Sequence, residues 1–175
     1  MRRVLILRHA KSDWPSGMPD LDRPLAARGV KACAVMGQYL AREMLLPDMA
    51  LVSPAKRTRE TWALIKPELG VHVTEHFEKR IYEAPWQQLL SVVQALPSAM
   101  RSVLLVGHNP GSAELAFNLT GFGDRYAAQR MAAGYPTCAL AVLDLMEGEW
   151  ADVTPRACRL DRFVTPASLG GGPDS

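Results

Sequence analysis

Two apolar runs that each lead into a histidine constrain this chain most. The first run, at residues 4–7, is followed directly by Arg8 and His9. The second, at residues 103–106, leads to His108. Short runs of leucine and β-branched residues predict buried strands. Because ligands of open α/β sheets bind at the carboxyl ends of the strands, we expect both histidines to lie at one site.

The rest of the sequence alternates strand and helix patterns. We expect strands at 3–8, 49–52, 71–74, 102–106 and 137–145, and an edge strand around 150–153. We expect helices at 25–44, from Ser53 as N-cap and Pro54 to about residue 65, at 86–96 after Pro85, and at 111–119. Alternating strands and helices predict a layered α/β fold. Residues 1–167 are expected to form a single domain and the glycine-rich residues 168–175 a disordered tail.

Composition narrows the class of protein. The chain has 175 residues, of which 48% are hydrophobic, and its net charge is +2. This charge is too small to predict a nucleic-acid partner. Cys33, Cys138 and Cys158 show no spacing typical of a disulfide framework or a zinc knuckle. Since no run approaches the ~20 apolar residues of a membrane span, we expect a cytoplasmic protein without a membrane partner.

The residues at the expected strand ends are suited to bind an anion. Arg8 and His9 come from the end of the first strand, His108 from the end of the later one, and Arg57 lies one helical turn beyond Ser53. Guanidinium groups match a phosphate as paired donors, and a neutral histidine can act as a nucleophile. Catalysis of phosphoryl transfer depends largely on holding and neutralising the phosphoryl oxygens. The four side chains therefore predict a site for a phosphoryl-bearing substrate.

Four motifs in order resemble the histidine phosphatase superfamily, which includes cofactor-dependent phosphoglycerate mutases. They are Leu-Arg-His-Ala-Lys-Ser at 7–12, Asp-Arg-Pro-Leu at 22–25 with Arg-Gly at 28–29, Ser-Pro at 53–54 with Arg57, and Val-Gly-His-Asn-Pro at 106–110. Within the superfamily the chain is most similar to the short SixA-type phosphohistidine phosphatases. The resemblance implies a three-layer fold like that of phosphoglycerate mutase, with a mostly parallel central sheet flanked by helices.

The resemblance also implies roles for single residues. His9 would be the nucleophile that forms a phosphohistidine intermediate, and Arg8, Arg57 and His108 would bind the phosphoryl oxygens. Glu83 is the nearest candidate for a proton donor, although the SixA-type branch is understood to lack the usual acid. The candidate substrate-binding residues are Lys11, Ser12, Arg28 and Asn109. No cofactor and no metal ion are expected.

The expected substrate is phosphohistidine on a protein, for example a protein of a signalling relay. Pro15 stands where the mutases carry an asparagine that donates to phosphate, which argues against mutase activity. Two alternatives stay open: a phosphatase for small phosphate monoesters, and a phosphate-binding module without turnover.

Overall fold

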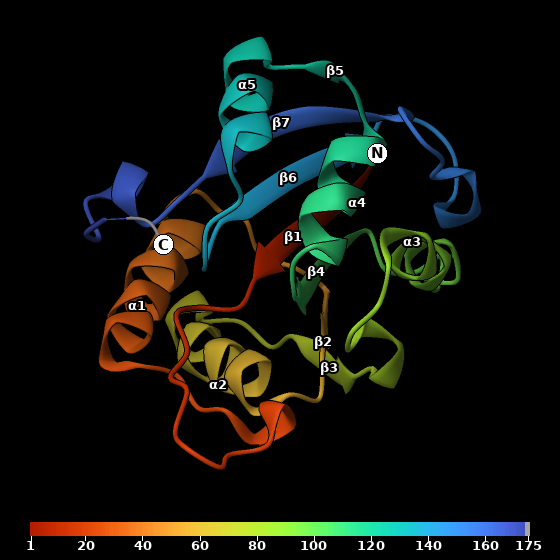
Figure 1. The fold of residues 1–175 in the computed structure, drawn as a ribbon. Coiled ribbons are helices and arrows are strands. Elements are labelled where there is room, and N and C mark those ends of the chain that lie inside the picture. Colours follow the sequence, from red (N-terminus) through yellow and green to blue (C-terminus); the bar gives the residue numbers. More distant parts are fainter. Residues whose placement is uncertain (174–175) are drawn as a thin grey trace.

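Within residues 1–173, which the computed structural model describes, seven strands form one sheet (Figure 1). In chain order the strands are β1 (Arg2–Arg8), β2 (Met49–Val52), β3 (Thr74–Phe77), β4 (Ser102–Gly107), β5 (Thr120–Gly123), β6 (Leu140–Leu145) and β7 (Cys158–Val164). Across the sheet they lie in the order β3-β2-β4-β1-β6-β7-β5. The strands from β3 to β1 are mutually parallel, β6 is antiparallel to β1 and β7, and β5 is parallel to β7. The prediction of a mostly parallel sheet is confirmed.

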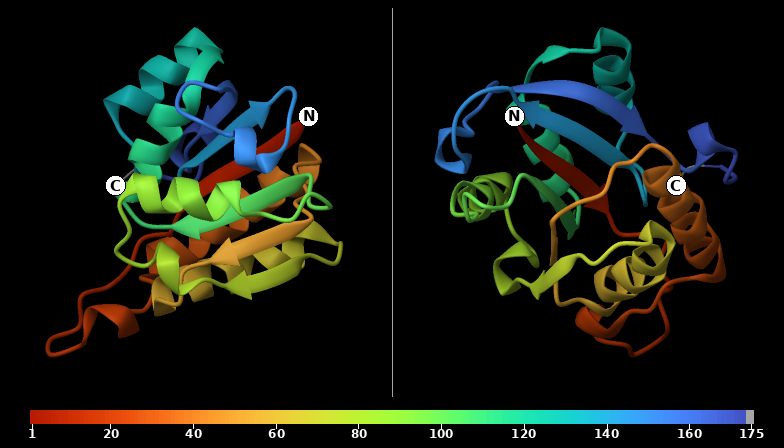
Figure 2. Two further views of the ribbon diagram at one scale, coloured as in Figure 1. Left: turned by 90° about the vertical axis from the view of Figure 1, so that its right-hand side faces the viewer. Right: turned by 180° about the vertical axis from the view of Figure 1, so that it is seen from behind.

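Helices cover both faces of the sheet and complete three layers (Figures 1 and 2). They are α1 (Ala27–Arg42), α2 (Lys56–Ile65), α3 (Trp86–Gln94), α4 (Gly111–Leu119) and α5 (Arg125–Ala133). Alternate residues of β1 point to opposite faces. Leu5 and Leu7 pack in a core with α1 and α2, whereas Val4 and Ile6 pack in a core with α3, α4 and α5. The near-continuous apolar run of β1 therefore reflects a strand buried on both faces.

Strand register brings the expected site residues to one edge of the sheet. Arg8 is level with Gly107, and Val52 is level with Val106. The residues that follow these strands, His9, Ser53 and His108, therefore leave the sheet side by side.

Two expectations about the middle of the chain are wrong in detail. Ser53 is not the N-cap of α2, which begins at Lys56 with Ala55 as its N-cap. The Ser53 hydroxyl instead lies 2.7 Å from Nε2 of His108. The strand expected at 71–74 is β3, Thr74–Phe77, so the expected position is about three residues early.

The C-terminal third differs most from expectation. The strand expected around 150–153 is a 3-10 helix, Trp150–Asp152, in which Trp150 is buried and its indole N–H donates to the carbonyl of Met100. The elements β5, α5 and β7 were not predicted. The sequence of β7, Cys-Arg-Leu-Asp-Arg-Phe-Val, lacks an apolar run because three of its residues are charged.

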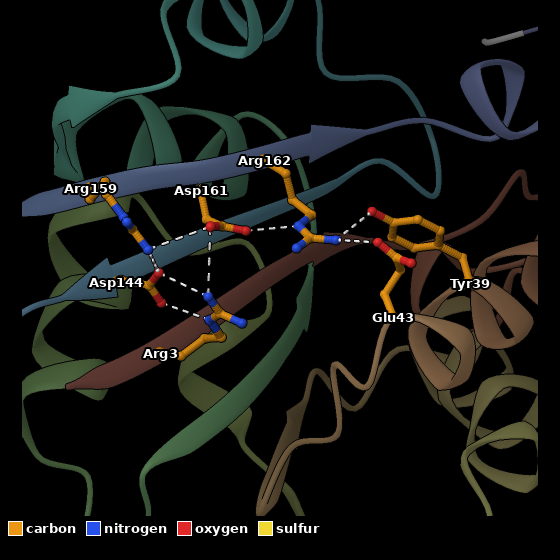
Figure 3. A network of polar contacts seen from close by, with 7 residues as sticks. All are labelled: Arg3, Tyr39, Glu43, Asp144, Arg159, Asp161 and Arg162. Carbon is orange, nitrogen blue, oxygen red and sulfur yellow. Dashed lines mark hydrogen bonds and ion pairs between the residues drawn. The ribbon is translucent and has the colours of Figure 1, made fainter.

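Those charges belong to a polar network that joins three strands and α1 (Figure 3). Asp144 of β6 is fully buried and accepts hydrogen bonds from Arg3 of β1 and Arg159 of β7. Burial opposes ionisation of Asp144, but the hydrogen bonds and charges of these two arginines outweigh it and hold its pKa below the usual value. Arg162 extends the network from β7 to the hydroxyl of Tyr39 in α1.

Of the tail expected at 168–175, residues 168–173 are described, and 174 and 175 lie outside the described residues. Leu169 ends a short 3-10 helix, Ala167–Leu169, and packs against the core formed with α1 and α2. In the described part of the chain no helix is long and apolar enough to cross a membrane.

Candidate active site

A cavity of about 230 Å³ opens at the carboxyl ends of β1 and β4. Its lining combines cationic, imidazole and neutral polar groups with one indole: Arg8, His9, Lys11, Ser12, Trp14, Arg23, Arg57, His108, Asn109 and Thr137. A larger cavity of about 470 Å³ near α4 and α5 is lined by residues such as Phe117, Met131 and Arg156. Among the described residues, the lining of the larger cavity contains no histidine or cysteine, so the groups suited to nucleophilic chemistry belong to the smaller one.

His9 lies directly after β1 and is only 8% exposed. Its Nδ1 lies 2.7 Å from the carbonyl oxygen of Ala10. Since a carbonyl oxygen can only accept, Nδ1 carries the proton and the neutral ring keeps a lone pair on Nε2. Burial, followed by the charges of His108 and the nearby arginines, lowers the pKa of His9 to about 3, although the bond to Ala10 favours the proton. His9 is therefore a neutral imidazole at pH 7.

The backbone around His9 is tied to α2 and to the segment that leads into β6. The N–H of Ala10 donates to the hydroxyl of Thr61 in α2, and Thr61 in turn donates to the carbonyl of Arg57. The carbonyl of His9 accepts from the N–H of Cys138. These bonds fix the position of the ring relative to α2 and β6.

His108 follows β4 and faces His9, with ring centroids 5.4 Å apart. The ring of Tyr82 meets it edge-on at 5.5 Å. Burial, followed by the charge of Arg57, lowers the pKa of His108 to about 4, so it too is neutral at pH 7. Its Nδ1 is buried without a hydrogen-bond partner among the described residues.

Two arginines supply the positive charge beside these rings. Arg8 donates from Nη1 to the carbonyl of Tyr135, and Arg57 donates from Nη1 and Nη2 to the carbonyl and carboxylate of Asp20. The Nε atoms of both are buried and lack a partner within residues 1–173. Burial lowers the pKa of Arg8. Buried donors without partners are costly, and a bound anion would satisfy them.

Three polar residues that the sequence reasoning missed complete the site. The Asp20 carboxylate accepts from Arg23, from Arg57 and, at 2.5 Å, from the hydroxyl of Tyr82. The hydrogen bond from Tyr82 and the two from the arginines hold the pKa of Asp20 well below its usual value. The spacing of Asp20 and Arg23 could have suggested an ion pair in this loop, but nothing in the sequence indicates that the pair reaches Arg57.

The structure therefore brings together most of the predicted site residues. Arg8, His9, Arg57 and His108 line the cavity, as do Lys11, Ser12 and Asn109. Arg28 is exposed and lies, with Lys11, beside a separate small hollow. Glu83 is exposed, has a positive φ of 54°, and is not part of the cavity lining.

No group of three His, Cys, Asp or Glu side chains that could hold a metal ion occurs within residues 1–173. The donors around the cavity are cations and neutral imidazoles, which suit an anion.

Comparison with known proteins agrees with this arrangement. Residues 4–89 match the family model of the histidine phosphatase superfamily (branch 1). An uncharacterized protein of Mycobacterium tuberculosis is 33% identical over 91% of this chain and 99% of its own length.

The fold is also similar to two solved structures of proteins that carry the provisional name phosphohistidine phosphatase SixA. The protein from Agrobacterium tumefaciens is 30% identical, with a TM-score of 0.81 over 94% of this chain and 98% of its own. The protein from Nakamurella multipartitia is 27% identical, with a TM-score of 0.81 over 94% of this chain and 96% of its own.

Proposed function

Because this chain belongs to the histidine phosphatase superfamily and is a phosphatase, we propose that it hydrolyses phosphohistidine on a protein through a phosphoryl intermediate on His9. The observation that carries this proposal is the hydrogen bond between Nδ1 of His9 and the carbonyl of Ala10. It leaves Nε2 unprotonated in a cavity shared with Arg8, Arg57 and His108.

In the first step, Nε2 of His9 attacks phosphorus opposite the leaving nitrogen. A bond forms between Nε2 and phosphorus while the phosphorus–nitrogen bond of the substrate breaks, and the departing imidazole takes a proton from solvent. In the second step water attacks the phosphoryl group on His9, releases inorganic phosphate and restores the neutral ring. Arg8 and Arg57 offset the charge on the equatorial oxygens throughout.

His108 is neutral at pH 7 because burial and the charge of Arg57 lower its pKa. The positive charges of Arg57 and Arg8 disfavour a proton on His108, and a bound phosphoryl dianion would offset those charges. We propose that the charge of the dianion raises the pKa of His108, so that the ring donates to a phosphoryl oxygen once substrate is bound.

The position of Glu83 favours phosphohistidine over an ester as the substrate. An alkoxide leaving group needs an acid close to the leaving oxygen, and the carboxylate of Glu83 does not line the cavity. An imidazole leaving group is a weaker base than an alkoxide and can take its proton from water. The site is thus better suited to a phosphorus–nitrogen bond.

The nucleophile can be tested with His9→Ala and a matched control, His76→Ala, at an exposed histidine outside the cavity. A phosphohistidine peptide is mixed with each protein, and quenched samples are analysed by mass spectrometry. We expect an acid-labile phosphoryl group on His9 of the wild type and the control, and loss of phosphate release in His9→Ala. Near-normal turnover by His9→Ala would refute the mechanism.

The substrate class is tested by comparing kcat/KM for the phosphohistidine peptide and for small phosphate monoesters. We expect the peptide to be preferred. A preference for a monoester would assign the protein to small-molecule phosphatases, and binding of both without turnover would make it a binding module.

A further inference from the structure

Trp14 differs from every other residue that lines the cavity. Among the described lining residues it is the one large apolar side chain, and it is 76% exposed. It belongs to the loop between β1 and the 3-10 helix Asp20–Asp22, which projects from the body of the molecule in the left view of Figure 2. Because the ring is mostly exposed and borders the cavity, its face is accessible to a ligand bound there.

The ring of Trp14 is held in place although it is exposed. The guanidinium carbon of Arg23 lies 3.2 Å from the ring centroid, so one face of the indole rests on a cation. Arg23 is itself 6% exposed and donates to the carbonyl of Asp13, the hydroxyl of Ser12 and the carboxylate of Asp20. The indole therefore has a supported face against Arg23 and leaves most of its surface open to solvent.

The base of the loop is also fixed. Ser12 and Leu25 form an antiparallel bridge, and the N–H of Asp13 donates to the carbonyl of Pro24. A ring that is ordered before the substrate arrives loses little conformational freedom on binding, which favours its use in recognition.

We propose that Trp14 determines specificity: its ring contacts the group that carries the phosphoryl, and selects a planar aromatic group over an aliphatic one. The charged side chains of the cavity bind the phosphoryl group itself, and an indole ring contributes nothing to that binding. The imidazole of phosphohistidine and the phenol ring of an aryl phosphate share the planar face that can stack on Trp14. This inference rests on the proposed function.

Turnover tests the proposal with phosphohistidine and phosphoramidate, which both contain a phosphorus–nitrogen bond but differ in the ring. We expect Trp14→Ala to lower kcat/KM for phosphohistidine by about tenfold, mainly through KM, because one aromatic contact is lost. Phosphoramidate should change less than about twofold, and Trp14→Phe should stay within about threefold of the wild type on both. Equal changes for phosphohistidine, phosphoramidate and a third substrate, phenyl phosphate, in Trp14→Ala would overturn the proposal.

Turnover of phenyl phosphate distinguishes the two aromatic groups, imidazole and phenol, that Trp14 could contact. A selective loss on phosphohistidine identifies the imidazole as the natural group, and a selective loss on phenyl phosphate identifies an aryl ester. Each of these outcomes supports the proposal, whereas selective loss on neither overturns it.

Binding of phosphonates tests Trp14 without relying on turnover. By calorimetry, the wild type should bind phenylphosphonate about tenfold more tightly than methylphosphonate, and Trp14→Ala should lose this difference. Equal affinity of the wild type for the two compounds would overturn the proposal. If the phosphonate difference is found but no phosphohistidine is hydrolysed, the proposed function fails while the role of Trp14 stands.

Tyr126→Ala is the matched control. Tyr126 is 70% exposed on α5 and is not part of the cavity lining. This variant should behave as the wild type with every compound, and a Tyr126→Ala that matched Trp14→Ala would attribute the effect to general loss of surface aromatic area and overturn the proposal.

Discussion

At the level of single residues, the neutral state of His9 follows from its surroundings. The ring is buried after β1, its Nδ1 proton is committed to Ala10, and arginines lie nearby. Each of burial and positive charge disfavours a second proton. The nucleophile is thus kept ready without a neighbouring base to take its proton.

The pH dependence of activity should reflect this. Since the pKa of His9 is lowered to about 3, protonation of His9 should not limit kcat/KM anywhere between pH 5 and 8. After correction for the second ionisation of the substrate phosphoryl, with a pKa of about 6, the profile should be flat on its acidic side. Stopped-flow measurement of phosphoenzyme formation checks this, and an acidic limb near pH 6.5 that remains after the correction would contradict it.

Asp20 places a negative charge beside Arg57, the same side chain that is proposed to bind the phosphoryl oxygens of the substrate. Its carboxylate accepts from Nη2 of Arg57 and from Arg23, so part of the positive charge of the site is already neutralised. A carboxylate next to Arg57 repels an incoming phosphate dianion. It should therefore limit how tightly the product is held.

Replacing Asp20 with asparagine should tighten inhibition by inorganic phosphate by about three- to tenfold, because one repelling charge is removed. Inhibition constants measured at fixed ionic strength check this. Asp22→Asn, which changes an exposed acid in the same 3-10 helix, is the control and should leave the constant unchanged. Weaker inhibition in Asp20→Asn would mean that Asp20 chiefly supports Arg57.

At the level of elements, the start of α1 is tightly fitted against the loop that follows β1. The N–H of Ala26 donates to the carbonyl of Lys11, and a Cβ at Gly29 would lie 2.1 Å from that same oxygen. The contact is with backbone, so it cannot be relieved by a side-chain rotation. Gly29 thereby allows α1 to approach the loop that carries Lys11 and Ser12 into the cavity.

Gly29→Ala should lower the free energy of unfolding by about 1–3 kcal/mol, as expected for overpacking, and should also reduce kcat/KM because Lys11 is displaced. Gly37→Ala on the same helix is the control. Its Cβ would meet the exposed side chain of Glu68 first, at 2.9 Å, and that side chain can move. Urea unfolding should place Gly37→Ala within about 1 kcal/mol of the wild type, and similar losses in both variants would contradict the interpretation.

The elements that the sequence predicts well are those whose residues follow a single period. The bounds of β2 and α4 agree with expectation at both ends, and β1 and β4 agree within one residue, since these strands are buried on both faces. The prediction fails for β7, whose arginines and aspartate are satisfied by partners on β1, β6 and α1. The pattern of one strand does not contain those partners.

The candidate site shows the same division. Arg8, His9 and His108 could be placed from the sequence because each comes next to a predicted strand end. Asp20, Arg23 and Tyr82 could not, because their contacts with one another depend on the path of an irregular loop. Glu83 was expected at the site from the family resemblance, and the turn after Tyr82 leaves it exposed.

At the level of the whole molecule, the site imposes a cost on folding that depends on pH. His9 and His108 have pKa values in the folded protein below the ordinary value of about 6.5. Between those values and pH 6.5 the unfolded chain binds more protons than the folded one. The stability of the fold therefore falls as the pH decreases through this window.

Urea unfolding should show a free energy of unfolding lower at pH 5 than at pH 7 by about 1–2 kcal/mol for each of the two histidines, less for the partly exposed His108. His9→Gln should remove its share, whereas His76→Gln, at an exposed histidine, should not. The lowered pKa of Asp20 acts in the same direction but below about pH 4, outside this window. A His9→Gln variant with the same pH dependence as the wild type would contradict the assignment.

The carbonyl of Tyr135 joins the two histidine-bearing strand ends to the antiparallel half of the sheet. It accepts from Arg8 at the end of β1 and from Asn109 after β4, while the Tyr135 hydroxyl donates to the carbonyl of Ile6 within β1. The peptide group of Tyr135 thus fixes the distance between the strand ends that carry His9 and His108. Insertions in the segment between α5 and β6 should accordingly alter both strand ends together, whereas the distant turn at 147–149 offers a place to lengthen the chain without reaching them.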